Sequence, residues 1–350
     1  MAPKRRHRRT EMEPNRRMVS DEPIEGNQTD EFDGHRRLPI SPFTIFFVVL
    51  FLLASSFAVY WGSRSTRKAP SHQLSVYERG IVKTDVCYKE ILIENARVMF
   101  NRSVRHFPNP VLAYITPWNS RGYEVAKEFT SKFTHISPVW YELKSQGKKL
   151  FLDGRDNADK RLVNDLSKNG NVLVLPRVVL EAFPADLLLN RKQWSKACNI
   201  ILKECREMEY DGIVLESWSR WARYGVLHDP EMRKMLLLGG NNEGGLVSHA
   251  HMIFLGMNLY GNDFVLSEGS GGAIIGRDYL SLLEKHRPAL RWDEKSAEHF
   301  FIYSHENLQH AVFYPSLKSI SMRLDEARAW GASLSLWEIG QGLDYFYELL

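Results

Sequence analysis

The chain has 350 residues, of which 44% are apolar and 25% are charged, as is typical of globular proteins. A formal net charge of +4 is too small to indicate a nucleic-acid-binding protein. Three cysteines exclude a disulfide-rich scaffold, and no Cys/His group has zinc-site spacing, so the sequence implies neither a metal nor a cofactor. The length fits two domains or one large barrel.

The N-terminal part of the sequence predicts a tail and a membrane anchor. Residues 1–42 carry nine basic and eight acidic residues without apolar periodicity, so we expect a disordered tail. Residues 43–61 contain no charge and are long enough to cross about 30 Å of hydrocarbon as a helix. The excess of Lys and Arg before this segment favours a cytosolic N-terminus. We predict an uncleaved transmembrane signal-anchor; a cleaved signal peptide and a secreted body are the alternative.

Residues 62–107 are expected to form a stem that leads into a body at 108–350. Asn101 begins a glycosylation sequon, which is usable only if this part of the chain lies in the secretory lumen or outside the cell. A second sequon at Asn27 should stay unmodified, because the tail is predicted to be cytosolic.

Short apolar runs alternate with helical patterns along the body. Strand-like runs cover 111–118, 133–143, 172–180, 211–217, 252–260, 311–314 and 332–339, and helical spacing covers 191–208 and 317–330. Apolar strands separated by helices are typical of a parallel sheet covered by helices. The repetition predicts an α/β fold of the TIM (β/α)8-barrel type.

Aromatic and polar side chains stand where several of these strands end. They are Tyr114, Trp118, Glu216, Trp218, Tyr260 and Trp337. In such barrels the carboxyl ends of the strands carry the chemistry. Aromatic faces that converge on one mouth suit the apolar faces of sugar rings, whereas the alternative for each of them is packing at the rim.

Six blocks of the body, in order, resemble the chitinase domain-containing proteins, a divergent branch of glycoside hydrolase family 18. The blocks are 111–123 (VLAYITPWNSRGY), 133–144 (FTHISPVWYELK), 210–218 (YDGIVLESW), 286–301 (HRPALRWDEKSAEHFF), 312–324 (VFYPSLKSISMRL) and 335–350 (SLWEIGQGLDYFYELL). The resemblance covers about 108–350. It implies a TIM barrel that binds chitin-type oligosaccharides without a cofactor.

The catalytic motif of that family is altered here. Active members carry D-G-x-D-x-D-x-E, and residues 211–218 read DGIVLESW, so Val214 and Glu216 replace two acids and Trp218 replaces the catalytic Glu. Tryptophan cannot supply the proton that the leaving oxygen needs, and Glu216 lies about 6.6 Å lower in the barrel. The resemblance therefore implies that conventional chitinase action is lost. Glu216 is left to bind a sugar, act on a deeper substrate, or pair with a cation such as Arg177. Asp211 is expected to brace backbone.

The barrel is predicted to be incomplete. The resemblance assigns 252–260 and 332–339 to strands seven and eight, and only 36 residues separate Glu216 from Ile253. Two further βα units need more chain than this. The M-x-Y-D motif of strand six is also missing from this interval. We expect strands five and six to be absent, with a junction near 235–238 and exposed apolar faces in an open barrel. A natural six-strand rearrangement is the alternative.

Three functions follow as hypotheses. The first is a non-catalytic glycan-binding protein that uses the six residues at the mouth. The second is a glycoside hydrolase with weak or altered activity on an N-acetylated glycan, with Glu216 and Asp211 as the candidate catalytic residues. The third is an anchored remnant that binds no sugar. In each, residues 43–61 attach the chain to a membrane.

Overall fold

The computed structural model of the chain describes residues 43, 46–47, 49–56, 74–99, 102–147, 149–169, 171–182, 191–217 and 250–350. The chain divides into two compact units, residues 1–71 and residues 72–350. Those residues of 43–56 that are described are helical. Within the described ranges no helix has the length and apolarity needed to cross a bilayer. The tail 1–42, Asn101, Trp218 and the proposed junction at 235–238 lie outside the described residues.

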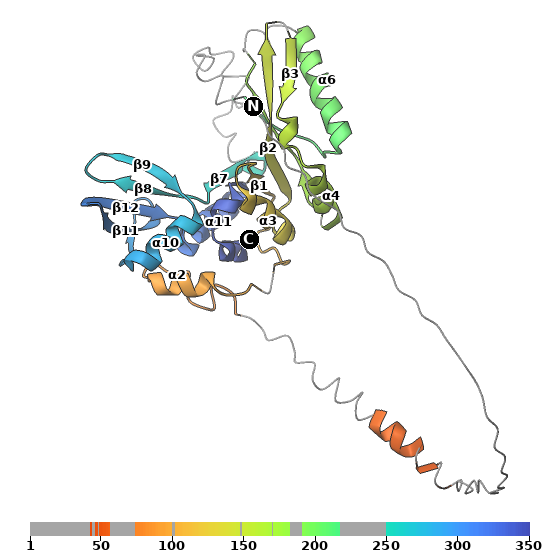
Figure 1. The fold of residues 1–350 in the computed structure, drawn as a ribbon, viewed down its shortest axis with the longest axis vertical. Helices are drawn as coiled ribbons and strands as arrows, with labels where there is room; N and C mark the ends of the chain where they lie inside the picture. The colour runs from red at the N-terminus through yellow and green to blue at the C-terminus, as the bar shows by residue number, and fades with distance from the viewer. Residues whose placement is uncertain are drawn as a thin grey trace, which may run out of the picture. The chain divides into compact units, whose positions relative to one another are not determined.

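A curled parallel sheet forms the centre of the second unit (Figure 1). Its strand order is β6-β5-β2-β1-β13-β7, and every neighbouring pair is parallel. The strands are β1 (Val111–Ile115), β2 (His135–Gln146), β5 (Arg177–Leu180), β6 (Val214–Glu216), β7 (Phe254–Asn258) and β13 (Ser333–Trp337). A short strand β4 (Leu173–Val174) also pairs with β2. Each strand falls within a run that the sequence predicted, except that β2 continues three residues beyond the predicted end at Leu143.

Helices cover the convex face of this sheet. They include α3 (Ser120–Glu128) against β1 and α4 (Lys160–Asn169) against β4. The helices α6 (Arg191–Met208) and α11 (Leu317–Trp330) have the bounds that the sequence predicted. Because side chains alternate along a strand, every second residue of β1 points towards the helices, and Val111, Ala113 and Ile115 are fully buried there.

The concave face of the sheet is partly open. Leu173 is 44% exposed and Phe254 is 39% exposed, although both lie on strands of the sheet. In a closed (β/α)8 barrel, side chains fill the interior. Among the described strands, β6 and β7 end the sheet and do not pair with each other. The described part is therefore a half-barrel. The interval assigned to the missing strands lies outside the described residues.

A second, antiparallel sheet was not foreseen. It has the order β10-β11-β12-β8-β9 and is inserted between β7 and β13 (Figure 1). Its strands are β8 (Gly261–Val265), β9 (Ser270–Ile274), β10 (Arg291–Asp293), β11 (Glu298–His305) and β12 (Leu308–Tyr314). The sequence predicted only the end of β12, because glycines in β9 and polar residues along β11 break the apolar runs. Helix α10 (Gly276–His286) packs on this sheet, where Tyr279 stacks on Tyr314 at 4.1 Å between ring centres.

Residues 74–99, which the sequence assigns to the stem, pack on the body instead. Their helix α2 (Tyr88–Asn95) contacts α10. Arg79 pairs with Glu94 at 2.6 Å and with Glu348 at 2.9 Å, so both ends of the unit are joined. The folded unit therefore begins before residue 108. The remaining elements are β3 (Lys149–Asp153), which pairs antiparallel with β2, and the 3-10 turns η1 (Thr130–Lys132), η2 (Arg155–Asn157), η4 (Ala250–Met252), η5 (Ile339–Gln341) and η6 (Asp344–Leu349).

Candidate functional site

Four side chains from four strands meet near the carboxyl edge of the concave face. Tyr114 of β1 and Trp337 of β13 lie 5.3 Å apart between ring centres. The guanidinium of Arg177, on β5, lies 5.3 Å from the centre of the Trp337 ring. The same guanidinium forms an ion pair with Glu216 of β6. Parallel strands end at one edge, so residues separated by more than 200 positions come together.

The electrostatics of this cluster depend on its burial. Burial lowers the pKa of Arg177, and the neighbouring Tyr114 and Glu142 oppose that shift. Burial raises the pKa of Tyr114, while Arg177 and a hydrogen bond from Ser335 act in the opposite direction. Arg177 remains cationic at all ordinary pH values. The ion pair shows that Glu216 has the partner the sequence suggested, and a carboxylate held by a guanidinium is an acceptor rather than a proton donor.

A groove of about 780 Å³ extends from Arg177 along the ends of β1, β2 and β5. Its lining residues are Pro117, Trp118, Val139, Trp140, Tyr141, Glu142, Asp153, Gly154, Asp156, Asn157, Arg177, Val179 and Glu181. Trp118 is 71% exposed and forms an accessible apolar wall. Trp140 is buried, and its indole N–H donates to the hydroxyl of Tyr123 at 2.8 Å. The groove thus has one exposed and one fixed tryptophan.

Carboxylates dominate the charge of the groove. Glu142, Asp153, Asp156 and Glu181 line it, against the single cation Arg177. Lys144 lies nearby and pairs with Glu142 at 2.6 Å and with Asp153 at 2.7 Å. The lining therefore carries a net negative charge, which disfavours anionic ligands. Among the described residues no group of three or more His, Cys, Asp or Glu side chains is placed to hold a metal ion.

Two further predicted site residues within the described ranges, Asp211 and Tyr260, have other contacts. Asp211 accepts a hydrogen bond from the backbone N–H of Val174 at 2.8 Å, so it braces backbone as the sequence suggested. Tyr260 follows β7, where its carbonyl accepts from the Asn258 side chain at 2.7 Å. Trp218 and Asn101 lie outside the described residues.

Sequence reasoning did not assign a role to Glu338, the residue after Trp337. Its carboxyl is completely buried and accepts from the Asn119 amide at 2.6 Å and from the Gly340 N–H at 3.3 Å. Burial raises the pKa of Glu338 to about 7, although these donors and the Thr116 N–H act against the shift. The only sequence signal was its position at the end of a predicted strand, beside an aromatic residue.

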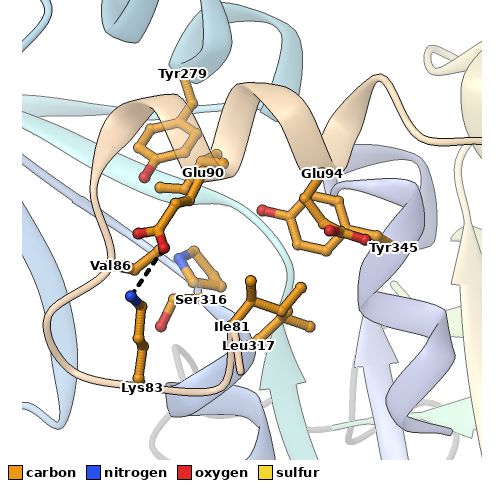
Figure 2. A pocket seen from close by; sticks show the side chains of 11 residues that line it. Ile81, Lys83, Val86, Glu90, Glu94, Tyr279, Ser316, Leu317 and Tyr345 are labelled. Carbon is orange, nitrogen blue, oxygen red and sulfur yellow. Dashed lines mark hydrogen bonds and ion pairs between the residues drawn. The ribbon is translucent and has the colours of Figure 1, made fainter. Parts of the chain in front are cut away.

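A smaller cavity lies beneath α2, and Figure 2 shows Lys83 and Glu90 joined across its edge. It encloses about 20 Å³, which is room for about one water molecule. Ser316 lines it, and the hydroxyl of Ser316 lies 2.8 Å from Nδ1 of His299. This pair resembles a nucleophile and its base, but the same hydroxyl caps α11 by accepting from the Ser319 N–H. Such a cavity cannot admit a substrate, so we interpret the pair as structural.

No family model matches the chain. Several solved structures share its fold. The spore cortex-lytic enzyme SleL of Bacillus cereus matches with a TM-score of 0.53 and 15% identity over 69% of this chain and 73% of that one. A class V chitinase from Pseudomonas fluorescens matches with a TM-score of 0.53 and 16% identity, over 69% of this chain and 98% of that one. Human YKL-39 is a pseudo-chitinase with retained chitooligosaccharide binding properties. It matches with a TM-score of 0.50 and 10% identity, over 69% of this chain and 98% of that one. At these identities the likeness establishes a fold like that of family 18 glycoside hydrolases.

Proposed function

We propose that the half-barrel binds a chitin-type oligosaccharide on its concave face and does not act as a conventional chitinase. The observation that carries this proposal is the Tyr114–Trp337–Arg177–Glu216 cluster, which offers two adjacent aromatic rings, tilted by 53° to each other, beside an ion pair. Aromatic rings take the apolar faces of sugars, and the charged groups suit their hydroxyls. We also propose that the chain is a shortened relative of chitinase domain-containing protein 1, on the six blocks quoted above.

The state of Glu216 supports binding rather than hydrolysis. A general acid must hold a proton and lie within about 3 Å of the leaving oxygen, or one water away. Glu216 faces Arg177, which favours the ionised carboxylate. In family 18 the acid is the last residue of the motif, and this sequence has Trp218 there. YKL-39 offers a precedent of a pseudo-chitinase that retains oligosaccharide binding.

The charge of the groove restricts the class of glycan. Its four carboxylates repel sulfated or carboxylated sugars, whereas N-acetylated oligomers are neutral. We therefore expect neutral N-acetylglucosamine oligomers to bind and heparin-type chains not to bind.

Calorimetric titration tests the proposal. The full chain in mild detergent is titrated with N-acetylglucosamine tetramer after its thermal unfolding has been recorded. We expect saturable binding that Trp337→Ala abolishes while the unfolding transition persists. A cooperative transition without binding contradicts the proposal and favours the anchored remnant. Absence of any transition would mean that the open barrel does not fold alone.

A weak glycoside hydrolase is the second candidate, because Glu216 lies on the concave face close to the aromatic pair. Release of reducing sugar from the same oligomer measures it. Activity that Glu216→Gln removes while Asp211→Asn retains it would favour hydrolysis through Glu216. We expect no release by the wild-type chain above the rate without protein.

The sequence of residues 43–61 and Asn101 supports a second part of the proposal. We infer a single-pass membrane protein with a cytosolic N-terminus and a body in the secretory lumen or outside the cell. In that topology Asn101 is glycosylated and Asn27 is not. A glycosidase-sensitive mass shift that disappears in Asn101→Gln but persists in Asn27→Gln is the expected result, and the reverse pattern would invert the topology.

A further inference from the structure

A side-chain hydrogen bond joins the loop that carries Trp118 to the residue that follows Trp337. Asn119 directly follows Trp118, and Glu338 directly follows Trp337. The amide nitrogen of Asn119 donates to the Glu338 carboxyl at 2.6 Å. Each partner in this bond is thus one residue away from an aromatic side chain of the proposed site.

Asn119 is held in the orientation that this bond needs. It is the N-cap of α3, and its side-chain oxygen accepts from the backbone N–H of Arg121 at 3.2 Å. With the oxygen used in the cap, the NH₂ group points away from the helix and towards Glu338. The start of α3 therefore fixes one end of the link.

Two glycines let the other end approach closely. A Cβ atom on Gly122 would lie 2.1 Å from a carboxyl oxygen of Glu338, and one on Gly340 would lie 2.2 Å from the backbone nitrogen of Gly122. Only residues without a side chain permit this contact. The buried carboxyl also accepts from the N–H of Gly340 and from that of Thr116, so it joins the β1–α3 loop to the turn after β13.

From this geometry we propose that Glu338 is a positioning residue, whose carboxyl sets the placement of Trp118 relative to Trp337 and thereby the affinity for the oligosaccharide. The inference rests on the proposed function. Glu338 does not touch the sugar, because it is completely buried; it acts through the two loops that carry the aromatic side chains.

Protonation of Glu338 weakens this link. The ionised carboxyl accepts hydrogen bonds from Asn119, Gly340 and Thr116. All three groups are donors, so a proton added to one carboxyl oxygen has no acceptor among them and displaces one of these bonds. Burial holds the pKa of Glu338 at about 7, so the change falls near neutral pH. We expect affinity to rise as pH increases through 7.

Among the described residues, the titratable groups that face Glu338 from neighbouring elements do not change charge in this range. They are Tyr123 of α3 and Tyr347 of η6, and burial raises the pKa of both. An ion pair on the same elements joins Arg121 to Asp344. On the concave face itself, burial lowers the pKa of His135.

The test measures affinity of the full chain for neutral N-acetylglucosamine tetramer between pH 5.5 and 8. We expect wild-type affinity to be about tenfold higher at pH 8, the equivalent of one hydrogen bond, and Glu338→Gln to bind weakly and equally at every pH. Glu298→Gln is the matched control, because burial also raises the pKa of Glu298 to about 7 but this residue lies in the antiparallel sheet. It should keep the wild-type profile.

Asn119→Ser provides a second variant if Glu338→Gln does not fold. Serine keeps an N-cap acceptor for α3 but lacks the amide donor. It should lower affinity at pH 8 and reduce the pH dependence. A pH dependence that survives in Glu338→Gln, or equal affinity in wild type at both pH values, overturns the inference while leaving glycan binding intact. Absence of binding by wild type at every pH instead contradicts the proposed function.

Discussion

The guanidinium of Arg177 lies 5.3 Å from the centre of the Trp337 ring. The same group forms an ion pair with Glu216, so one cation serves an aromatic ring and a carboxylate on different strands. Both partners of the pair are largely shielded, with side-chain exposures of 18% and 23%. Removal of the cation therefore leaves a carboxylate in a poorly hydrated position.

The first prediction concerns this pair. Arg177→Met should lower the free energy of unfolding by about 1–3 kcal/mol, because it removes the ion pair with Glu216. Glu216→Gln should cost less, and the double variant should be more stable than the sum of the two losses implies. Denaturant unfolding of the four proteins measures the coupling. Strict additivity would show that the pair contributes nothing.

Exposed Trp118 gives a prediction that separates binding from stability. Trp118→Ala should weaken oligosaccharide binding by about tenfold or more, the loss of one stacking contact. The unfolding temperature should hardly change, because the side chain is 71% exposed. Trp330→Ala is the control, since Trp330 is also exposed but lies on α11 and donates to Glu326. Equal losses of affinity in both variants would argue against a site at Trp118.

Asp211 is predicted to be structural. Asp211→Ala removes the acceptor for the Val174 N–H and should cost about 1–2 kcal/mol of stability. Asp211→Asn keeps an oxygen at that position and should cost less. Oligosaccharide affinity of the folded fraction should be the same in both variants and in wild type. A lost affinity at unchanged stability would instead place Asp211 in the binding site.

The close contact at Gly122 predicts a strong effect of one methyl group. Gly122→Ala should destabilise the fold by about 1–3 kcal/mol, because its Cβ would lie 2.1 Å from the Glu338 carboxyl. Gly272→Ala in β9 is the control, since nothing lies within 4 Å of its added Cβ. Thermal unfolding compares the two, and similar values would show that the α3 contact can relax.

The pH dependence of stability provides a further prediction. Burial raises the pKa of Glu338 and of Glu298 to about 7, above the usual 4.5. The folded state then holds these protons more tightly than the unfolded state. The stabilisation is complete below about pH 4.5 and is lost as pH rises through 7. It amounts to about 3 kcal/mol for each group at most.

The comparison is made between wild type and Glu298→Gln at each pH, because other groups titrate as well. Burial lowers the pKa of His106, His135 and His299, which gives the opposite slope below about pH 6.5. Relative to the variant, the free energy of unfolding of wild type should fall between pH 5 and 8. A constant difference would show that Glu298 titrates in its ordinary range.

The sequence by itself determined the parallel part of the fold. Apolar runs such as 111–118 and 332–339 identify strands, since a strand buried by helices must be apolar along its length. Helical periodicity gave α6 and α11 with their observed bounds. Tyr114, Glu216 and Trp337 were predicted to lie near one another because the carboxyl ends of parallel strands share one edge, and the structure brings them together around Arg177. The antiparallel sheet was missed, because strands with one open face carry mixed patterns.

Only the tertiary structure decided what the site residues do. Arg177 and Glu216 are 39 positions apart, and the sequence around each residue does not determine whether the two side chains form an ion pair. Their contact depends on β5 and β6 being neighbours in the parallel sheet, with Arg177 in register with Val214. The role of Glu338 depends in the same way on the approach of α3 to the turn after β13. Such contacts are determined by strand order and packing. A side chain contacts the residues that neighbouring elements place beside it, whatever their separation along the chain.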